Sequence, residues 1–243
     1  MGRYDTVDPD RLTMEALLRM IDYTLLKPEK TLGEYAEFIR EADKWAFRTV
    51  FLPPYYVPMA VGMLSMTDVK VGIPVSFPLG FSTPETKASE ALTALEDGAR
   101  EIDMVMNVSA ALSGEWDLVE EDMHEVAQTV RAWERASAQD PVPLKVILEI
   151  PYLNDEQIVE ACRRAESAGL DYVKTATGVG PGGATVEAVR LMRKTVGSEM
   201  GVKAAGGIRT WEQAREMIKA GANRIGTSTG PDIAKQFMLS KGS

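Results

Sequence analysis

The sequence predicts a single (βα)8 barrel of the TIM-barrel type that takes up residues 1–243. Eight short runs of apolar and β-branched residues alternate with longer stretches whose apolar residues recur three and four positions apart. The length of 243 residues suits one such barrel, and no linker-like segment divides the chain. A doubly wound open sheet is the alternative fold, but eight parallel strands without a second lobe fit a closed barrel better.

The barrel is expected to begin at about residue 21, after an extra helix over residues 5–20 (DTVDPDRLTMEALLRM). Each predicted strand is a short run of strand-forming residues bounded by turn or helix-start signals. The runs are IDYTLL from Ile21, RTVFLP from Arg48, VGIPVSF from Val71, EIDMVMN from Glu101, LKVILEI from Leu144, DYVKTA from Asp171, GVKAAGG from Gly201 and NRIGTS from Asn223.

The stretches between these runs carry helix signals at their ends. Thr83 and the following proline form a cap-like start to one amphipathic segment. Asn154 is a predicted N-cap in the next clear example, and Gly169 is the predicted stop. Thr210 and Gly221 bracket a third helix in the same way. The longest connection, residues 108–143, is expected to contain a helix and then the polar segment ASAQDPVP.

Composition narrows the function classes. The chain carries 27 Lys and Arg against 36 Asp and Glu, a formal net charge of −9, which disfavours non-specific binding to nucleic acid or membranes. One cysteine and one histidine exclude an internal disulfide and a Cys/His zinc site, and we expect neither metal nor cofactor. The start of the chain has no signal-like pattern, and no apolar run approaches the roughly 20 residues that span a bilayer. We therefore expect a cytoplasmic protein.

Two lysines at the ends of neighbouring predicted strands indicate chemistry. Lys174 lies in DYVKTATG, where burial disfavours an ammonium ion, and Lys203 holds a comparable place in GVKAAGG one strand later. Adjacent parallel strands lie roughly 5 Å apart, so each ammonium disfavours the other's charge and one amine can be neutral near pH 7. A neutral amine attacks carbonyls and forms a Schiff base. The simpler alternative is a lysine that extends its head group into solvent.

Asp103, in EIDMVMN, is the expected third member of this group. A carboxylate beside two lysines balances their charge, and with a bound water it can transfer protons. Its alternative role is a purely structural ion pair.

Glycine-rich turns follow the last three predicted strands. Barrels of this kind often bind phosphate there, through backbone N–H groups and a helix N-terminus. Gly206 and Gly207 follow the seventh run, and Ser228 follows the eighth at the start of a helix. The segment ATGVGPGG adds a third such loop. We also expect Thr24 and Thr177, polar residues just beyond strand ends, to contact the substrate.

The motifs together resemble the deoxyribose-phosphate aldolase family from about residue 21 to about residue 230. The matching stretches, in order, are IDYTLLKP, SFPLG, TKASEA, GAREIDMVMN, LKVILE, YVKTATG, KAAGGIRT and RIGTS. The resemblance implies a metal-free class I aldolase on a (βα)8 barrel, active in carbohydrate catabolism, that reversibly cleaves 2-deoxy-D-ribose 5-phosphate to glyceraldehyde 3-phosphate and acetaldehyde. It also implies that Lys174 forms the Schiff base, Lys203 tunes it and Asp103 transfers protons. Phosphate contacts would come from four residues, Gly178, Gly206, Gly207 and Ser228.

The sequence departs from the family pattern at several positions near the expected pocket. Phe51 and Pro53 replace a small thiol and a polar residue after the second strand. Ser76 stands where the family has glycine, and Ala176 and Val179 alter the lysine motif. We expect these changes to alter the walls around the sugar carbons and to reduce activity on 2-deoxyribose 5-phosphate. A lost substrate hydrogen bond, as at Ala176, costs about 0.5–1.5 kcal/mol.

Three functions therefore compete. The first is a deoxyribose-phosphate-type aldolase, the second is a related lysine aldolase or isomerase for another sugar phosphate, and the third is a barrel that binds a phosphorylated ligand without turnover. Apolar patches on barrel helices could support a homodimer, but the sequence locates none.

The remaining polar candidates have simpler expected roles. His124 is expected at the surface and Cys162 in the core. Lys145 and Glu149 are expected to form an ion-pair layer inside the barrel, and Tyr23 to line the mouth or pack.

Overall fold

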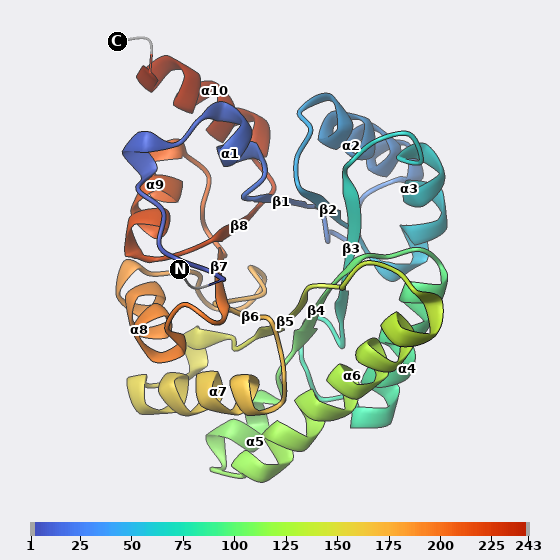
Figure 1. Ribbon diagram of the computed structural model, residues 1–243, viewed down its shortest axis with the longest axis vertical. Helices are drawn as coiled ribbons and strands as arrows, with labels where there is room; N and C mark the ends of the chain where they lie inside the picture. Colours follow the sequence, from blue (N-terminus) through green and yellow to red (C-terminus); the bar gives the residue numbers. More distant parts are fainter. Residues whose placement is uncertain (1–2, 242–243) are drawn as a thin grey trace.

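Eight parallel strands close into a barrel in the order of the sequence, from β1 to β8, which confirms the predicted fold (Figure 1). The structure is a computed structural model that describes residues 3–241. Every strand lies within or next to one of the predicted runs. The strands are β1 (Ile21–Thr24), β2 (Thr49–Phe51), β3 (Lys70–Val75), β4 (Glu101–Val105), β5 (Leu144–Ile147), β6 (Tyr172–Lys174), β7 (Gly201–Ala205) and β8 (Arg224–Thr227).

Helices surround this barrel as an outer ring (Figure 1). They are α1 (Met14–Leu18), α2 (Leu32–Lys44), α3 (Val57–Met63), α4 (Pro84–Glu96), α5 (Val108–Leu112), α6 (Trp116–Ser137), α7 (Asp155–Ser167), α8 (Val186–Val196), α9 (Trp211–Ala220) and α10 (Gly230–Lys241). Short 3-10 turns occupy Pro9–Arg11, Pro54–Tyr56 and Ile150–Tyr152. The predicted caps are present, because Thr83, Asn154 and Thr210 each accept a hydrogen bond from the first turn of α4, α7 and α9.

The N-terminal segment differs from the single helix predicted over residues 5–20. It forms a 3-10 turn and then the five-residue helix α1. Two capping residues divide the segment: the Asp8 side chain accepts from Asp10 N, and the Thr13 side chain accepts from Ala16 N. Leu12, between them, is extended with φ −62° and ψ 138°, so the helix cannot run through.

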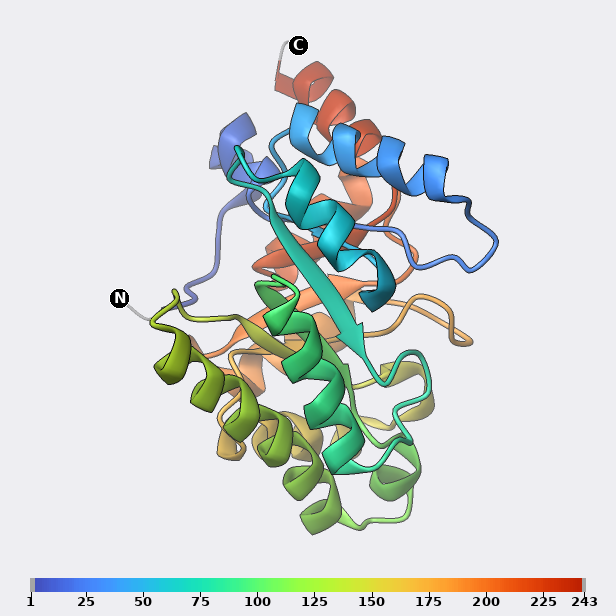
Figure 2. The ribbon, with the colours of Figure 1, turned by 90° about the vertical axis from the view of Figure 1, so that its right-hand side faces the viewer.

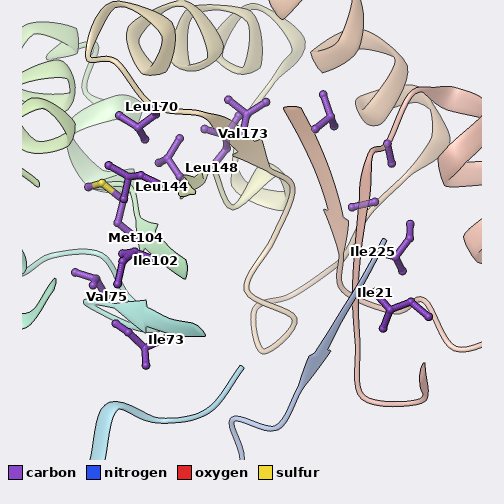
Figure 3. Packing of buried hydrophobic residues seen from close by; sticks show 14 of the residues in the cluster. Ile21, Ile73, Val75, Ile102, Met104, Leu144, Leu148, Leu170, Val173 and Ile225 are labelled. Carbon is purple, nitrogen blue, oxygen red and sulfur yellow. The ribbon is translucent and has the colours of Figure 1, made fainter. Parts of the chain in front are cut away.

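Alternation along the strands divides apolar from charged residues. In a strand, successive side chains point to opposite faces. Outward-facing residues of the strands, such as Ile73, Ile102, Met104 and Val173, join the apolar core between barrel and helices (Figure 3). The alternate positions point into the barrel, and many of them are charged.

Glycines on the inner face make room for large side chains. A Cβ on Gly72 would lie 2.6 Å from the Phe51 ring, and one on Gly201 would lie 2.0 Å from the Tyr172 ring. A Cβ on Gly226 would lie 3.2 Å from Cε of Lys203. The barrel interior therefore holds Phe51, Tyr172 and Lys203 because their neighbours lack side chains.

The carboxyl ends of the strands open on one side of the molecule. Figure 2 shows the loops after β1, β3 and β6 projecting together there, on the side opposite the start of the described chain. Across residues 3–241, no helix has the length and apolar character to cross a membrane.

Candidate active site

Lys174, Lys203 and Asp103 meet inside the barrel as the sequence predicts. Lys174 at the end of β6 lies directly beside Lys203 on β7 in the strand register. Asp103 reaches them from β4, and its Oδ2 accepts hydrogen bonds from Lys174 Nζ at 2.9 Å and Lys203 Nζ at 2.6 Å. One carboxylate oxygen therefore links both amines, which provides a direct path for a proton between them.

Further charged residues extend this group into a buried network. Lys203 Nζ also lies 2.5 Å from Asp22 Oδ2, and Lys145 Nζ lies 2.6 Å from Glu101 Oε2 and 3.0 Å from Asp103 Oδ1. Arg224 pairs with Asp22 and Glu101. We call these seven residues the interior network: Asp22, Glu101, Asp103, Lys145, Lys174, Lys203 and Arg224.

Only three members of this network, Lys174, Lys203 and Asp103, are among the site residues predicted from the sequence. Four others were missed or given another role: Asp22, Glu101, Lys145 and Arg224. Their signal was present, because charged residues at alternate strand positions share the inner face of a barrel. The expected ion-pair layer inside the barrel includes Lys145 but not Glu149. Glu149 lies beyond the end of β5, where its Oε2 accepts a hydrogen bond from Thr177 N at 3.1 Å.

These seven residues carry one excess positive charge when every member is ionised, because four cations meet three carboxylates; Arg48, which also reaches Glu101 at 3.5 Å, is 40% exposed and its charge is screened by water. Loss of one proton makes it neutral, and neutrality is favourable where water is excluded. Arginine does not give up its proton in proteins, so an amine must do so.

The pKa values of the network follow from burial and pairing. Burial lowers the pKa of Lys203 to about 8, against the attraction of Asp103 and Asp22. Burial alone would raise the pKa of Asp103, but Lys145, Lys174 and Lys203 hold it well below its usual value. Burial works against the charge of Lys145 too, yet Asp103 and Glu101 raise its pKa above the ordinary value. A carboxylate that stays ionised therefore lies beside an amine that releases its proton near neutral pH.

A cavity of about 310 Å³ lies above this network at the barrel mouth. Lys174 lines it and is 3% exposed, whereas Lys203 and Asp103 are 0% exposed and lie beneath. All six residues predicted to contact substrate or phosphate line the same cavity: Thr24, Thr177, Gly178, Gly206, Gly207 and Ser228. Gly178, Gly206 and Gly207 have φ of +85°, +97° and +83°, the left-handed region that glycine adopts without strain.

Two cationic residues that were not predicted as site residues also line this cavity, Lys27 and Arg209. Arg209 is exposed and is separated from the Gly206–Gly207 turn by one residue, Ile208. Its guanidinium forms no ion pair with any residue between 3 and 241, so it is free to meet an anion. The sequence could have indicated this residue, because the arginine in GGIRT lies two positions after the glycines expected to hold phosphate.

Of the departures from the family pattern, Val179 lines the cavity as expected, whereas Phe51 and Ala176 do not. Phe51 is 1% exposed and packs against the amines, with its ring centroid 3.9 Å from Lys203 Nζ. Ala176 is fully buried, 3.5 Å from the position of a Cβ on Gly206. Pro53 lines a neighbouring apolar groove that meets the cavity at Phe77. The prediction that these residues face the sugar carbons is therefore wrong for Phe51 and Ala176, because both point into packed structure.

Ser76 fixes the loop after β3. It has φ +54°, a left-handed conformation that costs a non-glycine residue energy. Its N donates to Glu90 Oε2 at 2.7 Å, and its Oγ lies 3.0 Å from Ser82 Oγ and accepts from Ser82 N at 3.3 Å. The serine hydroxyl therefore ties the two ends of the loop together.

The structure also shows where the three residues with simpler expected roles lie. His124 is exposed on α6, and Cys162 is fully buried, where burial raises the pKa of its thiol to about 12. Tyr23 packs outward against Phe38, with ring centroids 3.7 Å apart. None of the three takes part in the site.

Groups of three or more His, Cys, Asp or Glu side chains able to hold a metal ion do not occur within the described part of the chain. The carboxylates of the interior network are instead each paired with lysine or arginine. The donor set around the cavity is one of amines, backbone N–H groups and hydroxyls.

The fold and this buried amine group define a class of protein, a (βα)8 barrel with a lysine at its mouth that is equipped for carbonyl chemistry. Comparison with known proteins gives the family. A model of the DeoC/LacD family of aldolases matches residues 63–236. The chain belongs to this family of aldolases and is therefore a carbon–carbon lyase.

Similar proteins with assigned names cover nearly the whole chain. The deoxyribose-phosphate aldolase of Caldanaerobacter subterraneus subsp. tengcongensis is 49% identical over 91% of this chain and 93% of its own. That of Thermococcus gammatolerans is 50% identical over 90% and 95%. Among solved structures, an aldolase named QR15 has a TM-score of 0.85 and 38% identity, covering 93% of this chain and 97% of its own.

A further solved structure is the tetrameric deoxyribose phosphate aldolase from Aeropyrum pernix, with a TM-score of 0.85 and 33% identity over 94% of both chains.

Proposed function

We propose that this chain cleaves 2-deoxy-D-ribose 5-phosphate to glyceraldehyde 3-phosphate and acetaldehyde through a Schiff base on Lys174. One observation carries the assignment of the nucleophile. Of the three amines in the interior network, Lys174 alone lines the cavity, and the carboxylate that it contacts is shared with Lys203.

The reaction begins with a neutral Lys174. Its Nζ attacks C1 of the sugar aldehyde, and loss of water from the carbinolamine leaves an iminium ion. A base removes the proton of the 3-hydroxyl, the C2–C3 bond breaks, and its electron pair moves into the iminium to form an enamine. Glyceraldehyde 3-phosphate leaves. Protonation of the enamine at C2 and hydrolysis then release acetaldehyde and regenerate the amine.

Asp103 and Lys203 manage the protons of these steps. Asp103 stays ionised because the neighbouring lysines hold its pKa low, and its shared oxygen can relay a proton between the amines and a bound water. Lys203, whose pKa burial lowers to about 8, takes up the proton that Lys174 must lose. The shared oxygen of Asp103 lies within 3 Å of both nitrogens, at 2.9 and 2.6 Å.

The phosphate of the substrate would bind at the end of the cavity formed by the loops after β6, β7 and β8. Gly178, Gly206 and Gly207 let the backbone approach an anion closely, and Ser228 adds a hydroxyl. Arg209 adds a guanidinium without an ion-pair partner in the described chain. This end of the cavity supports preference for a phosphorylated aldehyde.

Two other functions remain testable alternatives. A Schiff-base aldolase for another sugar phosphate would use the same amines. A barrel that binds a phosphorylated ligand without turnover would not need three buried amines, which disfavour one another's charge.

The direct test is cleavage of 2-deoxyribose 5-phosphate in the absence of added metal, with kcat/KM compared for the phosphorylated and unphosphorylated sugars. We expect cleavage of both, with higher kcat/KM for the phosphorylated sugar. A matched variant, Arg209→Gln, should narrow the difference while kcat on the unphosphorylated sugar is retained. Preference for the unphosphorylated sugar would refute the phosphate assignment, and no cleavage of either would refute the substrate.

A further inference from the structure

An aromatic ring faces the buried amines from the opposite side of the barrel. Phe51 ends β2, and its ring centroid lies 3.9 Å from Lys203 Nζ, 5.0 Å from Lys145 Nζ and 5.9 Å from Lys174 Nζ. The ring is 1% exposed, and Gly72 on β3 leaves the space that it occupies. A cation within about 6 Å of a ring face is attracted to it, most strongly where water is excluded.

We propose that Phe51 is a positioning residue whose ring face holds the Lys203 ammonium against Asp22 and Asp103 and thereby sets the pH at which Lys203 releases its proton. The consequence for catalysis rests on the proposed function, in which Lys203 takes up the proton of Lys174. The interaction between ring and ammonium does not depend on it.

The ring attracts the Lys203 ammonium more strongly than the other two, because Lys203 Nζ lies nearest to the ring centroid. The charged groups that face it come from five other strands. They are Asp22 on β1, Asp103 on β4, Lys145 on β5, Lys174 on β6 and, through its pair with Asp22, Arg224 on β8. The carboxylates favour the ammonium, whereas the neighbouring amines and burial oppose it, and the pKa of Lys203 falls to about 8.

Phe51 affects the pKa of Lys203 in a different way from the charged groups. Its ring attracts the ammonium but not the neutral amine, so it favours the charged form without bringing a titrating group of its own. A small side chain at this position would both remove this attraction and leave space for water beside the network. The ring therefore keeps Lys203 protonated at a higher pH than burial alone would allow.

Fluorinated phenylalanines at position 51 isolate this interaction. One, two and three fluorine atoms progressively withdraw the negative charge from the ring face with little change in volume. We expect the pKa of Lys203 to fall stepwise through the series, by about 0.4 to 1.5 units in total. The titration is followed by NMR of protein labelled with ¹³C at the lysine Cε atoms, and the Lys203 signal is identified by its loss in Lys203→Arg.

The same fluorine series at Phe47 is the matched control. Phe47 is also fully buried, but it belongs to the outer core beside Tyr23, with ring centroids 5.0 Å apart. Substitution there should leave the Lys203 titration unchanged. Phe51→Leu, which keeps an apolar side chain and removes the ring face, should lower the pKa at least as far as trifluorination.

The outcomes separate this proposal from the proposed function. A stepwise shift in a protein that cleaves no sugar would support the role of Phe51 and reject the substrate. A stepwise shift with a parallel movement of the rising limb of the kcat–pH profile supports both. A Lys203 titration that does not follow fluorination, or that moves equally with the Phe47 series, would overturn the role of Phe51.

Discussion

Removal of the Lys203 charge should move the pH dependence of imine formation by a measurable amount. In Lys203→Leu, the interior network loses its excess positive charge, so no remaining amine gains stability by releasing a proton. The rising limb of the rate of imine formation should therefore move to higher pH.

The structure sets the size of this shift. Lys174 Nζ and Lys203 Nζ contact one oxygen at 2.9 and 2.6 Å, so the two nitrogens lie within about 5.5 Å of each other. At that separation and an effective dielectric constant of about 20, two unit charges repel by about 3 kcal/mol, equivalent to roughly two pH units. The carboxylates that Lys203 leaves unpaired act in the same direction.

The assay is the initial rate of borohydride-trapped adduct with acetaldehyde, measured from pH 5 to pH 10. Leucine leaves Asp22 and Asp103 with fewer partners, and breaking a buried ion pair can cost about 3–5 kcal/mol of stability, so folding is checked by thermal unfolding. Lys203→Arg is the matched control, because it keeps the charge and both carboxylate contacts but cannot accept a proton. Because arginine keeps the repulsion on Lys174, its rising limb should lie at lower pH than that of Lys203→Leu, and its overall rate of imine formation should fall because no group at this position can take up the proton. A limb that is unchanged in Lys203→Leu, with normal activity, would remove Lys203 from the mechanism.

Three further outcomes are expected. Asp103→Asn should lower kcat steeply, because the shared proton path is lost, while the trapped imine stays detectable by mass spectrometry; full turnover in this variant would assign Asp103 a purely structural role. Prolonged treatment with EDTA should leave kcat unchanged, and a loss restored by a divalent cation would contradict the lysine mechanism. In urea unfolding, Ser76→Ala should lower the free energy of unfolding by about 1–2 kcal/mol, because the strain stays and hydrogen bonds are lost. Ser76→Gly should cost less, because glycine adopts this φ freely, and equal losses would show that strain at Ser76 is negligible.

Much of the fold was predictable because its signals are local. The strand runs and the capping residues Thr83, Asn154 and Thr210 each depend on a few consecutive residues, and the structure follows them closely. The prediction of one N-terminal helix was wrong because local signals also decide that segment. Two capping residues, Asp8 and Thr13, outweighed an amphipathic pattern that continued across them.

The candidate site was predictable where neighbouring strands carry its residues. Lys174 and Lys203 lie side by side, and Asp103 reaches them across the barrel as its motif implied. The orientation of Phe51 was not predictable from the motif alone. Its side chain points inward toward the amines because β2 alternates in phase with its neighbours and because Gly72 leaves the space. Those facts depend on strand register, which one sequence does not fix.

The ion-pair partners of the long inward side chains could not be predicted from the sequence for a related reason. Lys145 and Glu149, four residues apart, were both expected in an ion-pair layer inside the barrel, but only Lys145 belongs to one. In the closed barrel it pairs with Glu101 and Asp103 on the adjacent strand β4. Cross-strand partners of this kind follow only from the register of β4 against β5, in which Asp103 lies opposite Lys145.

Reductive trapping tests the central claim most directly. The intact chain is incubated with acetaldehyde and borohydride, digested, and mapped by mass spectrometry, with Lys174→Arg as the control for labelling of other amines. The account predicts one dominant ethyl adduct on the peptide that carries Lys174, formed more rapidly as the pH rises through about 8, where Lys203 becomes able to take up a proton. A dominant adduct on Lys203 or Lys145, or equal labelling in the Lys174→Arg chain, would contradict it.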